Sequence, residues 1–367
     1  MAQGISFATQ DYLALSREPS VRQAVAEALA KYGPHAGSSP ILTGHTPLAD
    51  QLKREISQLT GMAHIILFPT GWGAGYGSIT GLIRPQDHVV LDERAHACLN
   101  QGAHAATRNV VLADHLHNDS VHEHLARIRA HDTRNAVMVV TEGVYSMDSD
   151  TPRLAALQDI CHAYDATLLV DVAHDLGALG PGGTGKIGEQ GLLGQIDLVM
   201  GSFSKCFATN GGFIAARSEN VAEYLSVYAT SHFFSSALSP LQAAAALQCA
   251  RIIQSPEGER RRAALEHVAT RLRAALTKRG LTVLGDMSAI VPMETHSAAV
   301  ARVACKLAEA RGLILAIIEF PAVPLNSARF RMQLMCDHSP QDMDLTAQIL
   351  DETVTEAREL LTTGAEE

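Results

Sequence analysis

One lysine, Lys205, stands where its side-chain amine could act as a nucleophile. It follows an apolar run at residues 197–200 and lies in a turn of small residues. A charged amine is costly to bury, so we expect this amine to be poorly solvated and reactive. Such a lysine can form a Schiff base with an aldehyde cofactor. The alternative interpretation is an ordinary surface lysine on a loop.

Two other segments carry the groups that such a cofactor needs. An apolar run at 167–170 ends in Asp171, and His174 follows shortly after it. A second run leads into the glycine-rich turn at residues 70–75. In enzymes that use pyridoxal 5'-phosphate (PLP), an acid partners the pyridine nitrogen. Glycine-rich backbone at a helix start can hold the phosphate. Together the three segments favour a PLP site over the surface-lysine interpretation.

Composition indicates an ordinary globular protein and excludes several other classes. The 367 residues are 47% hydrophobic and 19% charged, with a formal net charge of −10. This charge gives no electrostatic reason to expect nucleic acid or an anionic membrane as a partner. No apolar run approaches membrane-spanning length, and the N-terminus lacks the pattern of a secretory signal. The six cysteines form no CxxC pair and are expected to be reduced thiols of a cytoplasmic protein.

Short β-rich runs alternate with helical stretches over the first two thirds of the chain, which predicts an α/β fold. Because the runs are uniformly apolar, they suit a mostly parallel sheet covered on both faces. A helix starting at Leu48 should bury Leu48, Leu52, Ile56 and Leu59 on one face. The seven predicted strands are 64–68, 88–92, 109–112, 135–141, 167–171, 197–201 and 212–216.

After residue 216 the pattern changes, which predicts a second, smaller α+β domain. A long alanine-rich helix over 240–253 is expected to connect the domains, and Pro256 and Gly258 should break it before a charged helix at 259–279. The predicted boundaries are an N-terminal segment at 1–44 that packs with the small domain, a large PLP-binding domain at 45–250 and a small domain at 251–367. Further strands are predicted at 281–284, 289–291, 314–318 and 330–334.

With these segments in hand, the chain resembles the α-oxoamine synthase family. Residues 11–15 read Asp-Tyr-Leu-Ala-Leu, residues 141–148 read Thr-Glu-Gly-Val-Tyr-Ser-Met-Asp, and residues 323–331 contain Val-Pro and Ala-Arg-Phe-Arg. Each motif is similar to a family motif, and their order matches. The resemblance implies PLP fold-type I, the aspartate aminotransferase-like fold. It also implies a homodimer with the active site at the subunit interface.

The resemblance also implies roles for individual residues. Lys205 would hold the cofactor aldehyde and then move the Cα proton, and Asp171 would keep the pyridine nitrogen protonated. A helix N-cap is the alternative for Asp171. His174 would bond the phenolic oxygen, or be a core histidine. The other implied cofactor contacts are His96 stacked on the ring, Gly71, Trp72 and Ser202 at the phosphate, Ser236 from the partner subunit, and Ser146 near the cofactor oxygen. A plain turn serine is the alternative for Ser146.

An arginine is expected to bind the carboxylate of the amino-acid substrate, because a guanidinium donates two parallel hydrogen bonds and stays charged. Arg331 matches the family position and is preferred. Arg329, two residues away, lies on the same face of a strand and is the alternative. For each arginine, the other interpretation is a surface ion pair.

The chain departs from the family pattern mainly on the substrate side. Pro40 replaces an arginine, Val172 replaces a second acid, and Asp175 stands where a small residue is usual. Asp175 could cap a helix or touch an acyl thioester. These differences leave the identity of the amino acid and the acyl donor open.

The implied reaction is a decarboxylative Claisen condensation of a small amino acid with an acyl thioester, delivered by CoA or by an acyl carrier protein. The alternative in the same class is an aminotransferase, lyase or aldolase. A non-enzymatic partner subunit or PLP-sensing module is a third hypothesis, against which the presence of Lys205 argues. No metal site is predicted.

Overall fold

The computed structural model describes residues 4–363 and divides into two compact units. Residues 15–145 and 151–259 form the large unit, and residues 4–14, 146–150 and 260–363 form the small unit. Residues 15–44, which the sequence grouped with the small domain, fall in the large unit. The domain boundaries at 44 and 250 stay a prediction. The outermost residues of the first and last predicted segments, 1–3 and 364–367, lie outside the described part of the chain.

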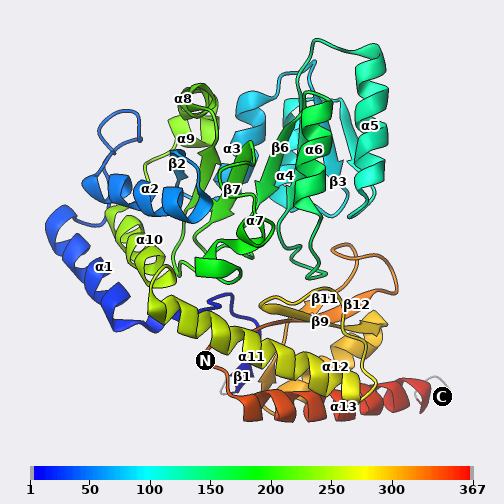
Figure 1. Ribbon diagram of the computed structural model, residues 1–367. Coiled ribbons are helices and arrows are strands. Elements are labelled where there is room, and N and C mark those ends of the chain that lie inside the picture. The colour runs from blue at the N-terminus through cyan, green and yellow to red at the C-terminus, as the bar shows by residue number, and fades with distance from the viewer. Residues whose placement is uncertain (1–3, 364–367) are drawn as a thin grey trace. The chain divides into compact units, whose positions relative to one another are not determined.

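The large unit is built on a seven-stranded sheet of order β2-β8-β7-β6-β5-β3-β4 (Figure 1). β8 is antiparallel to both of its neighbours, and all other pairs are parallel. The mostly parallel sheet is thus confirmed, and no strand end is more than two residues from its predicted position. The strands are β2 (His64–Phe68), β3 (His88–Asp92), β4 (Val110–Ala113), β5 (Val137–Glu142), β6 (Thr167–Asp171), β7 (Leu198–Ser202) and β8 (Gly212–Ala216).

Helices cover this sheet and bury its strands. α3 packs on β7 and β8, α5 packs on β3 and β4, and α6 packs on β6 beside α5 (Figure 1). All residues of β5, β7 and β8 are buried, which explains why these strands read as continuous apolar runs. These helices are α3 (Gly71–Leu82), α4 (Ala97–Ala106), α5 (Asn118–His131), α6 (Leu154–Ala163), α7 (Gly185–Glu189), α8 (Glu219–Tyr228) and α9 (Thr230–Phe233).

Three further helices of the large unit pack together, namely α1 (Pro19–Tyr32), α2 (Pro47–Thr60) and α10 (Pro240–Ile253). α2 buries Leu52, Ile56 and Leu59, as its periodicity predicts, whereas Leu48 in its first turn is only half-buried. α10 has its predicted bounds, because Ser239 and Gln242 form a reciprocal capping box at its start.

The charged helix α11 (Pro256–Lys278) begins three residues earlier than predicted. The side chain of Ser255 accepts hydrogen bonds from the amides of Glu257 and Gly258, at 3.2 and 3.4 Å. Proline is well tolerated in the first turn of a helix, where its missing N–H is not needed. Pro256 therefore starts the helix instead of breaking it.

The small unit is an α+β unit with two short sheets. One sheet has the antiparallel order β11-β12-β9, and β1 pairs in parallel with β10. The predicted strand at 281–284 forms only a bridge between Val283 and Met293, and the one at 314–318 is split in two. The elements are β1 (Ile5–Ser6), β9 (Ile290–His296), α12 (Ala298–Ala310), β10 (Leu313–Ile314), β11 (Ile317–Ile318), β12 (Ala328–Gln333) and α13 (Pro340–Thr363). Among residues 4–363, no helix is long and apolar enough to cross a membrane.

Candidate active site

A cavity of about 280 Å³ lies at the carboxyl ends of β5, β6 and β7, entirely within the large unit. Ligands of open parallel sheets characteristically bind at this edge. Seven predicted site residues line it: Lys205, Asp171, His174, His96, Gly71, Trp72 and Ser202. A larger hollow of about 470 Å³ beside α2 and β2 contains none of them.

Three predicted residues do not line this cavity. Ser236 belongs to the large unit and is exposed. Ser146 and Arg331 belong to the small unit, so their distance from the cavity is not defined. Their roles therefore stay predictions.

Asp171 ends β6 and is buried at the cavity. Its Oδ1 accepts a hydrogen bond from the amide of Ala173 at 2.8 Å, which closes a tight turn. No helix follows directly, so the helix-cap alternative does not apply. Burial raises the pKa of the Asp171 carboxyl, and the charges of His96 and Lys205 oppose this shift. A cation bound against Asp171 would favour its ionised form in the same way.

Glu142 is a cavity residue to which the sequence interpretation assigned no role. It ends β5 directly beside Asp171 in the register of the sheet. Its Oε1 accepts a hydrogen bond of 2.6 Å from the backbone amide of His96, the residue before α4. Burial, and then the charge of Asp171, raise the pKa of Glu142 well above its usual value. The signal that could have found it was its position at the end of an apolar strand, as for Asp171.

Lys205 is half-buried, whereas the sequence predicted a buried amine. It follows β7 in a turn closed by bonds from Ala208 N to Lys205 O and from Phe203 N to Gly211 O. The turn places Lys205 on the wall of an open cavity, which leaves part of its side chain accessible. Its charge acts on both Asp171 and Glu142. The ammonium therefore lies within electrostatic reach of both acids.

The start of α3 forms a cradle for an anion at the same cavity. Thr70 caps the helix by accepting a bond of 2.9 Å from Gly73 N. The amides of Gly71 and Trp72 lie in the first turn, where a helix offers no internal acceptor. A Cβ on Gly71 would stand 2.4 Å from the Oγ of Ser202, so only glycine lets the helix start approach β7 this closely. The helix start and the Ser202 hydroxyl suit a phosphate.

These observations fit PLP as the cofactor. The cavity combines a phosphate cradle, a buried acid for the ring nitrogen and an amine for the aldehyde carbon. His96 and His174 are the two imidazoles on its wall.

Asp175 does not line the cavity but is completely buried next to His174. Its Oδ2 accepts a hydrogen bond of 2.7 Å from the amide of Lys186 in the first turn of α7. Of the two functions left open by the sequence, the structure supports capping a helix.

In the small unit, the two arginines of β12 have different surroundings. Arg329 forms a buried ion pair with Asp148. Within residues 4–363, the buried Nε of Arg331 has no hydrogen-bond partner, and its NH1 group meets only the sulfur of Met147, at 3.4 Å. Burial lowers the pKa of Arg331. Arg331 is therefore the arginine with hydrogen-bonding capacity left for a carboxylate.

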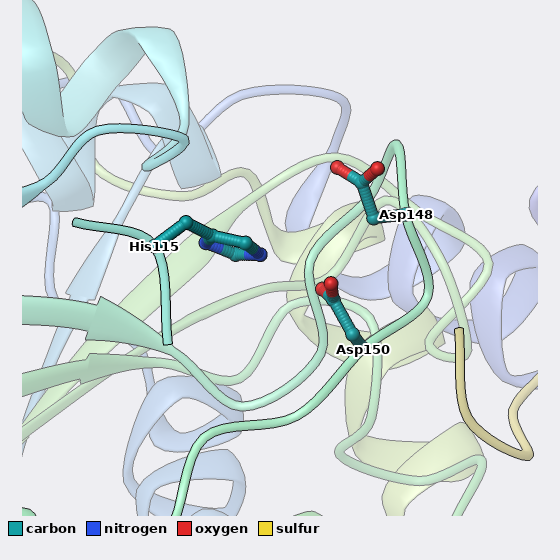
Figure 2. Close-up of side chains that lie close together, drawn as sticks. All are labelled: His115, Asp148 and Asp150. Atoms are coloured by element: carbon teal, nitrogen blue, oxygen red, sulfur yellow. The ribbon is translucent and has the colours of Figure 1, made fainter. Parts of the chain in front are cut away.

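Elsewhere in the large unit, His115 Nδ1 forms a hydrogen bond of 2.9 Å with Asp92 Oδ1, and the His115 ring packs edge-on against Tyr145. Figure 2 draws His115 together with Asp148 and Asp150. These two acids belong to the small unit, and acidic groups are common without an ion. No metal centre is assigned to them.

Comparisons with known proteins show the family of the chain. Residues 2–350 match the family model "Aminotransferase class I and II". An 8-amino-7-oxononanoate synthase of Salmonella dublin is 34% identical over 351 residues, covering 95% of this chain and 89% of the relative.

Solved structures are similar as well. A serine palmitoyltransferase from S. paucimobilis with a bound PLP–myriocin aldimine has a TM-score of 0.91 and 27% identity, covering 96% of this chain and 88% of that one. An 8-amino-7-oxononanoate synthase from Francisella tularensis, at 22% identity, shares the fold with a TM-score of 0.80, covering 96% and 98% of the two chains.

The fold and the family model define a PLP fold-type I protein of the aminotransferase class. Within this class, the chain belongs to the α-oxoamine synthases. It is therefore a PLP-dependent acyltransferase that forms a carbon–carbon bond, as the sequence motifs predicted.

Proposed function

We propose that the chain condenses a small L-amino acid (glycine, alanine or serine) with an acyl thioester, releasing CO2 and a free thiol and yielding an α-amino ketone. The observation that carries this proposal is the convergence of Lys205, Asp171, His174 and His96 on one cavity of an α-oxoamine synthase fold.

Several residues of the large unit would hold the cofactor. Lys205 would bond its aldehyde carbon, Asp171 would partner the ring nitrogen, and His174 would bond the phenolic oxygen. His96 would stack on the ring, and the cradle of Gly71, Trp72 and Ser202 would bind the phosphate. When bound, PLP supplies an electron sink for the electrons left on the substrate Cα.

The chain's own groups would then bind the substrate and move the proton. Arg331 would bind the amino-acid carboxylate, because its guanidinium has unused donors. Lys205 Nζ would take the Cα proton and later return it, since an amine in a partly desolvated site can serve as a general base. Ser146 would lie near the cofactor oxygen.

The proposed assembly is a homodimer in which Ser236 of each subunit completes the phosphate site of the other. The exposure of Ser236 in the large unit fits this arrangement. All six cysteines lie in the described residues and none of them forms a disulfide there, which fits a reducing, cytoplasmic setting. The thioester carrier is CoA or an acyl carrier protein.

Mass spectrometry of products from a panel of amino acids and acyl thioesters would test the reaction. We expect CO2, free thiol and an α-amino ketone with one amino acid. A keto acid formed from the amino donor without thiol release would instead indicate an aminotransferase.

Borohydride reduction followed by peptide mapping would test the cofactor site. We expect the label on the peptide containing Lys205, and its loss in Lys205→Ala. Lys186→Ala is the matched control, because Lys186 pairs with Glu189 at 2.8 Å outside the cavity. A label elsewhere would contradict the proposal.

A further inference from the structure

The carboxyl group of Asp175 is buried without full hydrogen bonding, although it lies outside the cavity. The side chain is 0% exposed, and only Oδ2 has a partner, the Lys186 amide at 2.7 Å. Within residues 4–363, Oδ1 is buried and accepts no hydrogen bond. Leaving such a group unsatisfied is costly, so a retained carboxylate at this position calls for a physical reason.

The carboxyl group is held between two glycines. A Cβ on Gly143 would stand 2.6 Å from Asp175 Oδ2 and 2.8 Å from Oδ1, and one on Gly185 would stand 2.6 Å from Oδ2. Gly143 directly follows Glu142, and its amide bonds Asp171 O at 2.8 Å. The Asp175 side chain thus contacts the backbone beside the two buried acids on one side and the start of α7 on the other.

The backbone of Asp175 belongs to the segment that presents His174 to the cavity. The amides of Leu179 and Ala178 bond Asp175 O, at 2.9 and 3.0 Å, and the Leu176 amide bonds Val172 O at 3.0 Å. Movement of Asp175 would therefore move His174, its neighbour in the chain.

We propose that Asp175 is a positioning residue whose side chain holds the segment carrying His174 against Gly143 and the Lys186 amide, and so keeps His174 at the cavity. This inference rests on the proposed function, in which His174 contacts the cofactor.

The charged groups that act on Asp175 are Asp171 and Lys186. Burial raises the pKa of Asp175 to about 7; the charge of Asp171 adds to this shift, while Lys186 opposes it. Because the folded pKa exceeds the ordinary value of 3.8, this group stabilises the fold fully below about pH 4 and loses that contribution as the pH rises to about 7.

Two substitutions, Asp175→Ala and Asp175→Asn, test whether the side chain of Asp175 positions the segment that carries His174. Asparagine keeps the shape and an oxygen for the Lys186 amide, whereas alanine removes both. For Asp175→Ala we expect about tenfold weaker PLP binding and about tenfold faster hydrogen exchange of the Lys186 amide in the cofactor-free protein. Asp175→Asn should have wild-type PLP affinity and wild-type exchange of the Lys186 amide. Its stability should not decline between pH 4 and pH 7, because asparagine does not titrate. Glu189→Gln, which changes an exposed side chain of α7, should leave both values at the wild-type level.

Wild-type PLP affinity and Lys186 exchange in Asp175→Ala would overturn the proposal, as would an Asp175→Asn variant that is as impaired as Asp175→Ala. The exchange measurement needs no cofactor. Failure of the proposed function, seen as borohydride label away from Lys205, is therefore distinguishable from failure of this inference.

If Asp175→Ala folds poorly, a double mutant with Gly143→Ala still tests the packing of the Asp175 side chain against Gly143. Gly143→Ala should destabilise the wild type, because its new Cβ meets the Asp175 carboxyl group. It should be better tolerated in the Asp175→Ala background, where that space is empty. Strictly additive effects on the free energy of unfolding would contradict the packing on which the proposal depends.

Discussion

At the scale of single residues, the site concentrates acids that are removed from water. Glu142 and Asp171 end neighbouring strands, and burial raises the pKa of both. Each has an assigned hydrogen-bond donor from the backbone, His96 N for Glu142 and Ala173 N for Asp171. The local structure therefore keeps their oxygens in place whether or not they are ionised.

Glu142→Leu would leave the His96 amide without its acceptor, so we expect the free energy of unfolding to fall by about 1–3 kcal/mol. Glu142→Gln keeps an acceptor and should lose less. Since the folded pKa of Glu142 lies above 4.5, wild-type stability relative to Glu142→Gln should decline as the pH rises from about 4.5. Denaturant titrations at several pH values would measure this, and a pH-independent difference would contradict it.

The two arginines of β12 should separate binding from stability. Arg331→Lys removes the bidentate hydrogen bonding to the substrate carboxylate, so KM for the amino acid should rise about tenfold. The free energy of unfolding should change little. Arg329→Met leaves the Asp148 carboxylate buried without its cation and should destabilise the protein by about 3–5 kcal/mol. The reverse pattern, measured by kinetics and denaturation, would make Arg329 the substrate residue.

At the scale of elements, close approach of α3 to the strand ends forms the phosphate cradle. Gly71 and Gly212 meet where α3 starts and β8 begins, and a Cβ on Gly212 would stand 2.6 Å from the Cα of Gly71. Two glycines at this crossing allow the helix start to reach the cavity.

Gly71→Ala should therefore displace the start of α3 and weaken PLP binding by about tenfold, because overpacking of this size costs about 1–3 kcal/mol. Gly73→Ala is the matched control on the same helix, since its Cβ would meet only Thr70 Oγ1 at 3.0 Å and Ser231 Cβ at 3.7 Å. PLP titration followed by absorbance would compare the two. Equal affinities would show that the cradle does not bind the phosphate.

At the scale of the whole molecule, the large unit leaves apolar side chains exposed in the segment that precedes Ser236. Phe234 is 80% exposed and Tyr228 is 57% exposed. Exposed aromatic groups of this kind commonly mark protein–protein contacts, which fits the proposed homodimer.

Phe234→Glu should shift the protein from dimer toward monomer in sedimentation velocity and weaken PLP binding, because the partner's Ser236 would no longer reach the phosphate. Leu112→Glu is a control, as Leu112 is 51% exposed at the other end of the large unit's sheet, on β4. A Phe234→Glu variant that remains dimeric with wild-type affinity would contradict this assembly.

The sequence alone was sufficient to predict the seven-stranded sheet and to direct attention to Lys205, Asp171 and His174, which line one cavity; their roles stay predictions. These three residues come at or just after the ends of apolar runs that form strands. Parallel strands bring their carboxyl ends to one edge of the sheet, irrespective of the loops between them. The short strands of the small unit were predicted less well, because runs of two residues carry little periodicity.

Other features depend on contacts between residues far apart in the chain, and only the tertiary structure decided them. These are the pairing of Arg329 with Asp148, the bond from His96 N to Glu142, and the burial of Asp175 between Gly143 and Gly185. Hydrophobic pattern reports which face of an element is buried, but not which polar group it meets there, because that depends on packing between elements.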